Sequence, residues 1–283
     1  MEMTSAILVT GCNGQLGSEL RRILGDRAVY TDIDTLDLCN RDEVERFMRI
    51  GGFDYVINCA AYTAVDRAEE EKIQCHAANV EAVENLARAA AKYGSRIVQI
   101  STDYVFDGNH YTPYHEGDKT NPLSVYGITK RKGETALLGL APESIVIRTG
   151  WLYSSFGNNF MKKMIALAQK GGNLKVVSDQ IGTPTYAADL ANAIVDIINQ
   201  TKWTPGVYHF SNEGVASWYD FALAIIEEKA IDCAVTPIST DDYPTAATRP
   251  KYSVLDKNKI KTTYGISISH WRVALRRCLK ELS

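Results

Sequence analysis

A tyrosine and a lysine separated by three residues are the first candidates for chemistry in this 283-residue chain. Tyr126 and Lys130 would share one face of a helix, because residues four apart lie one turn apart. A nearby ammonium favours the phenolate, so we expect Lys130 to lower the pKa of Tyr126 from its usual value of about 10. Such a pair is typical of a general acid and base. With fifteen tyrosines in the chain, about one such spacing is expected by chance, so the pair needs a fitting context.

A hydroxyl group is expected beside this pair. Ser101, Thr102 and Asp103 directly follow the apolar stretch 97–100, and ligands of open α/β sheets bind beyond the carboxyl ends of the strands. Thr102 would hydrogen-bond a carbonyl oxygen, Tyr126 would donate a proton to it, and Lys130 would bind a nicotinamide ribose while tuning the tyrosine. The set predicts hydride transfer to a carbonyl. The alternative is a capping hydroxyl and a surface tyrosine.

The dinucleotide that this chemistry requires has a candidate site near the N-terminus. Residues 11–17 read Gly-Cys-Asn-Gly-Gln-Leu-Gly, a G-x-x-G-x-x-G loop between an apolar and a helical stretch. Glycines let backbone N–H groups approach a pyrophosphate, and the start of a helix favours negative charge. The alternative is a glycine-rich connection without a ligand. The expected cofactor contacts in this loop are Gly11, Asn13, Gly14, Gln15, Leu16 and Gly17.

Asp32 is the candidate for binding the adenosine ribose. It lies at the end of the expected second strand, 21 positions after Gly11, where a carboxylate can accept hydrogen bonds from ribose hydroxyls. Asp32 would repel a 2'-phosphate and so favours NADH over NADPH. The alternative is an aspartate in a turn, and Arg21 or Arg22 could still reach a phosphate, so both NADPH and NADH remain candidates. Further cofactor contacts are expected from Asp37, Leu38, Ala60, Ala61 and Tyr62.

The elements that must position these groups alternate along the chain. Short apolar runs occur at 6–10, 28–31, 55–58, 97–100 and 145–149, with helical periodicity between them. This alternation predicts an α/β fold with a doubly wound parallel sheet, the Rossmann arrangement. We expect residues 1–150 to form an NAD(P)-binding Rossmann domain and 151–283 mainly a smaller C-terminal substrate-binding lobe. A part of about 175–212, including a strand at 206–210, is expected to return to the Rossmann domain.

The composition of the chain limits the classes of partner that we expect. The formal net charge of −3 recommends neither nucleic acid nor an anionic membrane, and no run approaches the roughly 20 apolar residues of a membrane span. Six scattered cysteines without a C-x-x-C pair, and an N-terminus without a basic leader, favour the cytoplasm. The five histidines show no H-E-x-x-H spacing, and there is no G-x-S-x-G elbow or P-loop. No metal is therefore expected.

Taken in order, the glycine loop, Ser101-Thr102-Asp103 and Tyr126-x-x-x-Lys130 resemble the extended short-chain dehydrogenase/reductase superfamily. Longer blocks are similar to the dTDP-4-dehydrorhamnose reductase family and span nearly the whole chain. These blocks are Gly14-Gln15-Leu16-Gly17, Ala61 to Asp66, Ser101 to Gly108, Asp179 to Thr185, Ser217-Trp218-Tyr219 and Arg249 to Asp256.

The resemblance implies reduction of the C4 ketone of a dTDP-4-dehydro sugar, the last step in making dTDP-L-rhamnose. It implies Thr102, Tyr126 and Lys130 as the catalytic set and a small-molecule nucleotide sugar as the partner. Aromatic faces suit the apolar side of a deoxysugar, and a donor and a bidentate cation suit a diphosphate. The implied substrate contacts are Thr63, Thr102, Asp103, Tyr104, Tyr126 and Trp151 for the sugar, and Asn159 and Arg249 for the diphosphate.

The chain departs from the family pattern in one loop. The common Ser-Trp is Gly150-Trp151 here, and Tyr153-Ser154-Ser155 lacks the usual Tyr-Gly; this departure concerns the loop and not the chemistry. Some members of the family dimerise through a magnesium ion held by surface acids, but that set does not map onto this chain. A monomer or a homodimer is therefore expected, without a metal.

Two other functions fit the same scaffold. A nucleotide-sugar 4,6-dehydratase or an epimerase shares the Tyr/Lys pair, but dehydratases place Asp-Glu after the threonine, where this chain has Asp103-Tyr104. A non-catalytic dinucleotide-binding subunit, similar to the regulatory subunit of methionine adenosyltransferase, would not need the complete Thr/Tyr/Lys set. Both remain alternatives.

Overall fold

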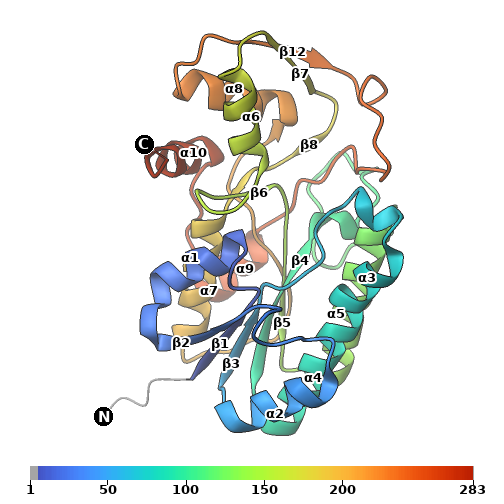
Figure 1. Cartoon of the computed structure of the whole chain (residues 1–283), viewed down its shortest axis with the longest axis vertical. Helices are drawn as coiled ribbons and strands as arrows, with labels where there is room; N and C mark the ends of the chain where they lie inside the picture. The colour runs from blue at the N-terminus through green and yellow to red at the C-terminus, as the bar shows by residue number, and fades with distance from the viewer. Residues whose placement is uncertain (1–5, 283) are drawn as a thin grey trace.

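The computed structural model describes residues 6–282 and has a lower lobe built on a six-stranded parallel sheet and a smaller upper lobe (Figure 1). The strand order is β10-β5-β4-β3-β1-β2, with all neighbouring strands parallel. This is the doubly wound sheet that the alternating runs predicted. The strands are β1 (Ile7–Thr10), β2 (Ala28–Thr31), β3 (Tyr55–Asn58), β4 (Arg96–Thr102), β5 (Ile145–Thr149) and β10 (Gly206–His209).

Helices cover both faces of this sheet (Figure 1). Successive side chains of a strand point to opposite faces. Ile7 and Val9 accordingly pack in one cluster with Leu20, whereas Leu8 packs in another with Met48. The first face carries α1 (Gln15–Leu24), α7 (Ala187–Asn199) and α9 (Asn258–Tyr264). The second carries α2 (Arg41–Gly51), α4 (Ala82–Tyr93) and α5 (Val125–Leu140).

The sixth strand comes from far along the chain. Strand β10 pairs with β5, with Gly206 opposite Ile145, and α7 packs against α1. In the segment 175–212, α7 and β10 therefore lie on the main sheet. Strand β7 (Asn173–Val177), in contrast, pairs in parallel with β12 (Ala234–Ile238) in the upper lobe. The two lobes are interleaved in sequence.

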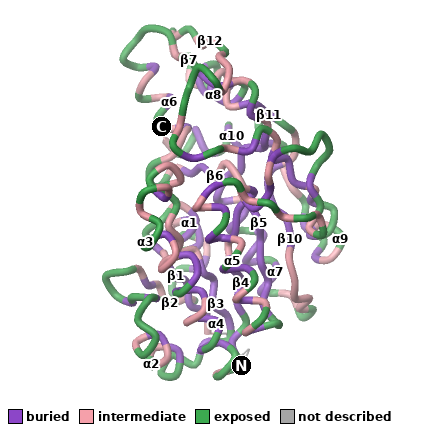
Figure 2. Tube along the Cα trace, turned by 90° about the vertical axis from the view of Figure 1, so that its right-hand side faces the viewer, coloured by how far each residue is buried: buried purple, intermediate pink, exposed green. Residues whose placement is uncertain are grey.

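The upper lobe has its own core under three helices, α6 (Phe160–Ala168), α8 (Trp218–Glu228) and α10 (Trp271–Lys280). Helix α6 begins where Asn159 accepts a hydrogen bond from the Lys162 amide at 3.1 Å, which is the usual role of an N-cap residue. In Figure 2 the buried residues gather along the strands of the lower sheet, beneath this lobe. The fold thus places the carboxyl ends of β1, β3, β4 and β5 below the upper lobe.

Shorter elements complete the chain: η1 (Gly25–Arg27), η2 (Arg67–Glu69), α3 (Lys72–His76), the π-helical turn η3 (Ala77–Glu81), η4 (Asp103–Val105), β6 (Leu152–Tyr153), β8 (Ile181–Gly182), β9 (Thr185–Tyr186) and β11 (Ala216–Ser217). Across residues 6–282, no helix has the length and apolar character to span a bilayer. Residues 1–5, part of the argument for a cytoplasmic location, lie outside the described residues.

Candidate active site

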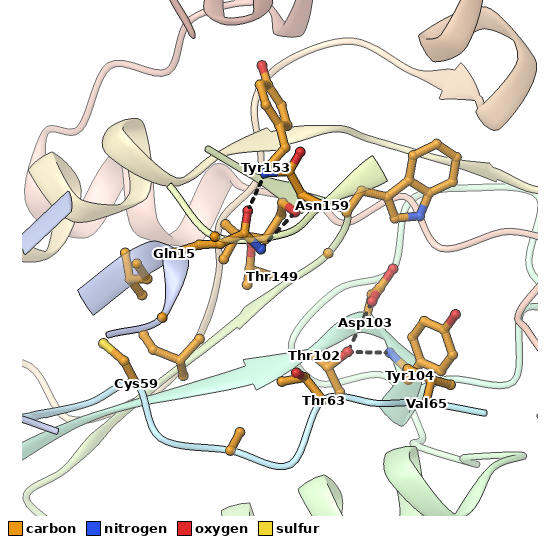
Figure 3. A pocket seen from close by; sticks show the side chains of 18 of the residues that line it. Gln15, Cys59, Thr63, Val65, Thr102, Asp103, Tyr104, Thr149, Tyr153 and Asn159 are labelled. Atoms are coloured by element: carbon orange, nitrogen blue, oxygen red, sulfur yellow. Dashed lines mark hydrogen bonds between the residues drawn. The ribbon is translucent and has the colours of Figure 1, made fainter. Parts of the chain in front are cut away.

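A cavity of about 670 Å³ lies between the two lobes and is lined by both. Its lower wall contains the glycine loop, Thr102, Tyr126 and Lys130, and its upper wall contains Trp151 and Trp218. The residues that the sequence singled out separately therefore meet in one space. Figure 3 shows Gln15, Thr102 and Asn159 around it. The expected site residues that line it are Gly11, Asn13, Gly14, Gln15, Leu16, Gly17, Ala61, Thr63, Thr102, Asp103, Tyr104, Tyr126, Lys130, Trp151 and Asn159.

The glycine loop is closely packed on the neighbouring backbone. Gly11 has a φ of +64°, and a Cβ atom there would lie 2.5 Å from the Ala60 nitrogen. A Cβ atom on Gly17 would lie 2.4 Å from the Gly11 oxygen. Gly14 is the N-cap of α1 and has no side chain to accept from the first turn. The first amide groups of α1 are therefore available to an anion such as a pyrophosphate.

Thr102 ends β4 and lines the cavity. Its Oγ1 accepts from the Tyr104 amide at 3.2 Å and donates to Oδ1 of Asp103 at 3.2 Å (Figure 3). Asp103 is buried, and burial raises the pKa of its carboxyl group to about 6. Gly150 packs against this carboxylate, because a Cβ atom there would lie 2.5 Å from Oδ2. The glycine that departs from the family pattern thus makes room for Asp103.

Tyr126 and Lys130 lie in the first two turns of α5, whose N-terminus is capped by Ser124. The Lys130 ammonium donates to the Ile100 carbonyl oxygen at 2.6 Å. Burial lowers the pKa of Lys130 to about 8 and raises the pKa of Tyr126 to about 12. The expectation that Lys130 lowers the tyrosine pKa is therefore wrong for this arrangement, because desolvation of the phenol dominates. A hydrogen bond with Thr102 acts in the opposite direction.

Aromatic rings form the upper wall. The indoles of Trp151 and Trp218 are stacked, with centroids 3.5 Å apart and planes 3° from parallel, and Phe160 packs against Trp218 at 4.6 Å. In the lower wall, Tyr104 packs edge to face against Tyr126, with ring centroids 5.5 Å apart. Trp218 and Phe160 were not among the expected site residues. The only sequence signal for Trp218 was its place in the Ser217-Trp218-Tyr219 block.

Several expected cofactor residues lie outside the lining of this cavity. Asp32 lies beside the loop, where its Oδ2 accepts from the Asn13 amide at 2.9 Å. Asp37 accepts from the Cys39 amide at 2.9 Å, and the Leu38 side chain is buried in the core against the α2 face. The Tyr62 hydroxyl donates to Glu71. The Ala60 amide donates to Oδ1 of Asn58 at 3.1 Å.

The two residues expected at a diphosphate are separated. Asn159 lines the main cavity, where its Nδ2 donates to Oε1 of Gln15 at 3.1 Å, linking the glycine loop to the upper lobe. Arg249 instead lines a neighbouring cavity of about 470 Å³ and forms a two-point ion pair with Asp66 at 2.8 and 2.7 Å. The two cavities share a wall formed by Tyr104, Phe160 and Trp218.

Further residues line the main cavity without having been expected there. They are Cys59, Val65, Ile100, Ser101, Thr149, Gly150, Leu152, Tyr153, Gly157, Asn158, Phe160, Trp218 and Phe221. Most follow strand ends or the 152–160 loop, where a sequence pattern does not show which side chain faces inward. Among residues 6–282, no group of three or more His, Cys, Asp or Glu side chains is placed to hold a metal ion.

Known proteins resemble this chain over nearly its whole length. The family model described as the RmlD substrate binding domain matches residues 4–283. A curated dTDP-4-dehydrorhamnose reductase from Aggregatibacter actinomycetemcomitans is 44% identical, covering 95% of this chain and 97% of its own. A Clostridium acetobutylicum dTDP-4-dehydrorhamnose reductase structure has a TM-score of 0.95 at 43% identity, covering 98% of this chain and 99% of its own. A Bacillus anthracis dTDP-4-dehydrorhamnose reductase structure in complex with NADP has a TM-score of 0.95 at 36% identity. The match covers 99% of this chain and 100% of its own.

Proposed function

Because this chain belongs to the family of the RmlD substrate binding domain, we propose that it reduces the C4 ketone of dTDP-4-dehydro-L-rhamnose to dTDP-L-rhamnose with NADPH or NADH. The observation that carries the proposal is the meeting of Thr102, Tyr126 and Lys130 with the glycine loop in one cavity. The enzyme is then an oxidoreductase of dTDP-rhamnose biosynthesis.

The proposed chemistry follows from the cavity. A bound reduced nicotinamide supplies the hydride. Thr102 orients the sugar carbonyl when its hydroxyl hydrogen turns from Asp103 to the carbonyl oxygen, and Tyr126 donates the proton that completes the alcohol. The raised pKa of Tyr126 keeps the phenol protonated at neutral pH, so the donor is loaded before the reaction. Lys130 lies one turn away on α5, and its ammonium is proposed to bind the nicotinamide ribose.

The substrate is proposed to span the two neighbouring cavities, whose linings have Tyr104, Phe160 and Trp218 in common. The deoxysugar fits between Thr102 and the stacked indoles of Trp151 and Trp218, which offer flat apolar faces. The nucleotide diphosphate extends past Tyr104 into the second cavity, which Lys163 and Lys175 also line. Because Asp66 neutralises much of the Arg249 charge, these lysines are the stronger candidates for phosphate contacts.

The cofactor is proposed to lie along the glycine loop with its pyrophosphate at the start of α1. The Asn13 amide donates to the Asp32 carboxylate beside the glycine loop, and this position supports Asp32 as the acceptor for the hydroxyls of the adenosine ribose. This carboxylate disfavours a 2'-phosphate without blocking it. The related Bacillus anthracis structure contains NADP, and we propose that this chain accepts both NADPH and NADH.

The domain roles, the location and the oligomeric state are also proposed. The 1–150 segment would serve the cofactor and most of 151–283 the substrate. A net charge of −3 and free cysteines throughout the described residues agree with a cytoplasmic protein. A monomer or homodimer is expected, and light scattering coupled to size-exclusion chromatography measures which.

A stoichiometry assay tests the function. The purified protein is given excess dTDP-4-dehydrorhamnose and limiting NADPH or NADH, and products are counted by mass spectrometry. One sugar reduced per cofactor oxidised is expected. Sugar conversion far beyond the cofactor supplied would replace the reductase with an epimerase or dehydratase, since those enzymes return the hydride to the same substrate. Cofactor binding without any conversion would favour a non-catalytic subunit.

A further inference from the structure

A buried ion pair lies directly behind the catalytic set. Glu134, on α5, binds Arg148, on β5, through two hydrogen bonds of 2.9 and 2.8 Å, and their side chains are only 1% and 3% exposed. The Ser101 hydroxyl, on β4, donates to the same carboxylate at 2.5 Å. One carboxylate thus joins three elements of the lower lobe.

Each of these elements also carries part of the cavity wall. Glu134 lies one turn after Lys130 and two turns after Tyr126, so all three share one face of α5. Ser101 immediately precedes Thr102 along β4. The distance between the Tyr126 hydroxyl and the Thr102 hydroxyl is therefore set by how α5 sits on β4. Two polar contacts join these elements here, from Lys130 to the Ile100 carbonyl oxygen and from the Ser101 hydroxyl to Glu134, and Glu134 also binds Arg148 on β5.

Stability alone does not explain the pair. Removing two charges from water costs about as much as their attraction returns, and apolar replacements of such pairs are often neutral for stability. What a buried, fully hydrogen-bonded pair does supply is a single geometry, because any shift breaks several short bonds. A reaction between Thr102, Tyr126 and a substrate carbonyl requires such a fixed geometry.

We propose that Glu134 is a positioning residue for the reduction, holding α5 in register with β4 through Ser101 and Arg148 and keeping Lys130 in its ammonium form. This inference rests on the proposed reductase function. Glu134 does not line the cavity and does not contact the reacting atoms. It acts through Ser101, Arg148 and Lys130.

The charges around Lys130 support the proposal that Glu134 keeps this lysine in its ammonium form. Besides burial, the groups that act on the pKa of Lys130 are Glu134 on its own helix, Cys59 after β3 and Cys75 on α3, and all three raise it. Burial raises the pKa of both thiols, so they are neutral at pH 7. Glu134 is therefore the charged group in this set that opposes the desolvation of Lys130.

The test is the double variant Glu134→Met with Arg148→Met, which removes both charges and keeps the side-chain volumes similar. We expect a melting temperature near that of the wild type, a kcat at least about tenfold lower and a sugar KM changed by less than about threefold. The basic limb of the kcat profile should move to lower pH by about half a unit or more, since Lys130 loses its charge as pH rises through a lower pKa. Wild-type kcat and an unmoved limb in the folded variant would overturn the proposal.

Two single variants frame this result. Ser101→Ala removes one hydrogen bond without unpairing a charge, so it folds even if the double variant does not. A kcat about three- to tenfold lower with an unmoved limb is expected, and an unchanged kcat would refute the register argument. Arg131→Leu is the matched control, because Arg131 approaches Glu134 at 3.6 Å from the exposed side. It should leave both kcat and the limb unchanged.

A measurement without turnover separates this inference from the reductase assignment. The cofactor-free protein, labelled with ¹⁵N-lysine, is titrated by NMR, and the Lys130 signal is assigned with Lys130→Met. The double variant should titrate at lower pH than the wild type. If the shift occurs but no sugar is reduced, the function fails and the electrostatic role stands; if the protein reduces sugar but Lys130 titrates unchanged, that role is wrong.

Discussion

Replacing Gly17 with alanine is expected to damage cofactor binding by a predictable amount. The added Cβ atom would lie 2.4 Å from the Gly11 oxygen and 2.5 Å from the Cys12 Cα. Ordinary contacts begin at 3.4 Å, so the loop must move by about 1 Å. Such a shift takes a backbone N–H···O contact of about 2.9 Å beyond hydrogen-bond range. A bond to a charged group contributes about 1.5–3 kcal/mol, so the dissociation constant should rise about 10- to 100-fold.

Fluorescence titration with NADPH measures this constant, and circular dichroism checks the fold. Gly139→Ala is the control, because this glycine also lies in a helix but its Cβ atom would meet nothing within 4 Å. That variant should bind NADPH normally and be more stable by about 0.5–1 kcal/mol. A folded Gly17→Ala protein that binds NADPH within about threefold of wild type would refute the argument, since the loop would then have absorbed the clash without consequence.

Tyr126→Phe should fold normally and lose roughly 10²–10⁴-fold in kcat, and wild-type turnover would remove the phenol from the mechanism. Trp218→Ala should raise the sugar-nucleotide KM about tenfold, because an aromatic contact adds about 0.5–1.5 kcal/mol beyond its buried area; an equal change in the cofactor KM would contradict a sugar subsite. The raised pKa of Asp103, about 6, means that the folded state holds its proton up to higher pH than the unfolded state, so this carboxyl destabilises the fold as pH rises from about 4 to 6. Asp103→Asn should therefore gain up to about 3 kcal/mol in unfolding free energy relative to wild type between pH 4 and pH 7, and a constant difference in denaturant titrations would count against this. Asp32→Ala should shift the ratio of kcat/KM values toward NADPH, and an unchanged ratio would show that Asp32 does not read the ribose.

Much of the sheet was predictable because β1, β3 and β5 are buried on both faces. Such strands appear as short continuous apolar runs, and the runs at 55–58 and 145–149 coincide with β3 and β5. The run at 28–31 coincides with β2, a partly exposed edge strand. The placement of β10 also followed from its apolar pattern and is seen in its pairing with β5. In contrast, β7 pairs with β12 about 60 residues later, and a parallel pair of that separation leaves no local signal.

The cavity residues could be predicted where the backbone alone brings a residue into the cavity. They could not be predicted where the direction of a side chain determines whether it lines the cavity. The loop of Gly11 and the strand end at Thr102 line the cavity because glycine spacing and sheet topology fix them. The stack of Trp218 on Trp151 depends on two segments 67 residues apart. Likewise, the pKa of Tyr126 follows its burial, which the spacing to Lys130 does not reveal.

The late arrival of β10 has a consequence for how the protein is made. Ribosomes deliver the chain from the N-terminus at about 5–20 residues per second, so β5 emerges about 3–12 seconds before its partner at Gly206–His209. Until then every residue of Ile145–Thr149, buried in the finished protein, lies on an open sheet edge, which is a template for unwanted pairing. Helix α9, at Asn258–Tyr264, covers the same core later still. The nascent lower lobe is therefore incomplete until most of the chain has been synthesised, and this interval is when a chaperone has an apolar edge to hold.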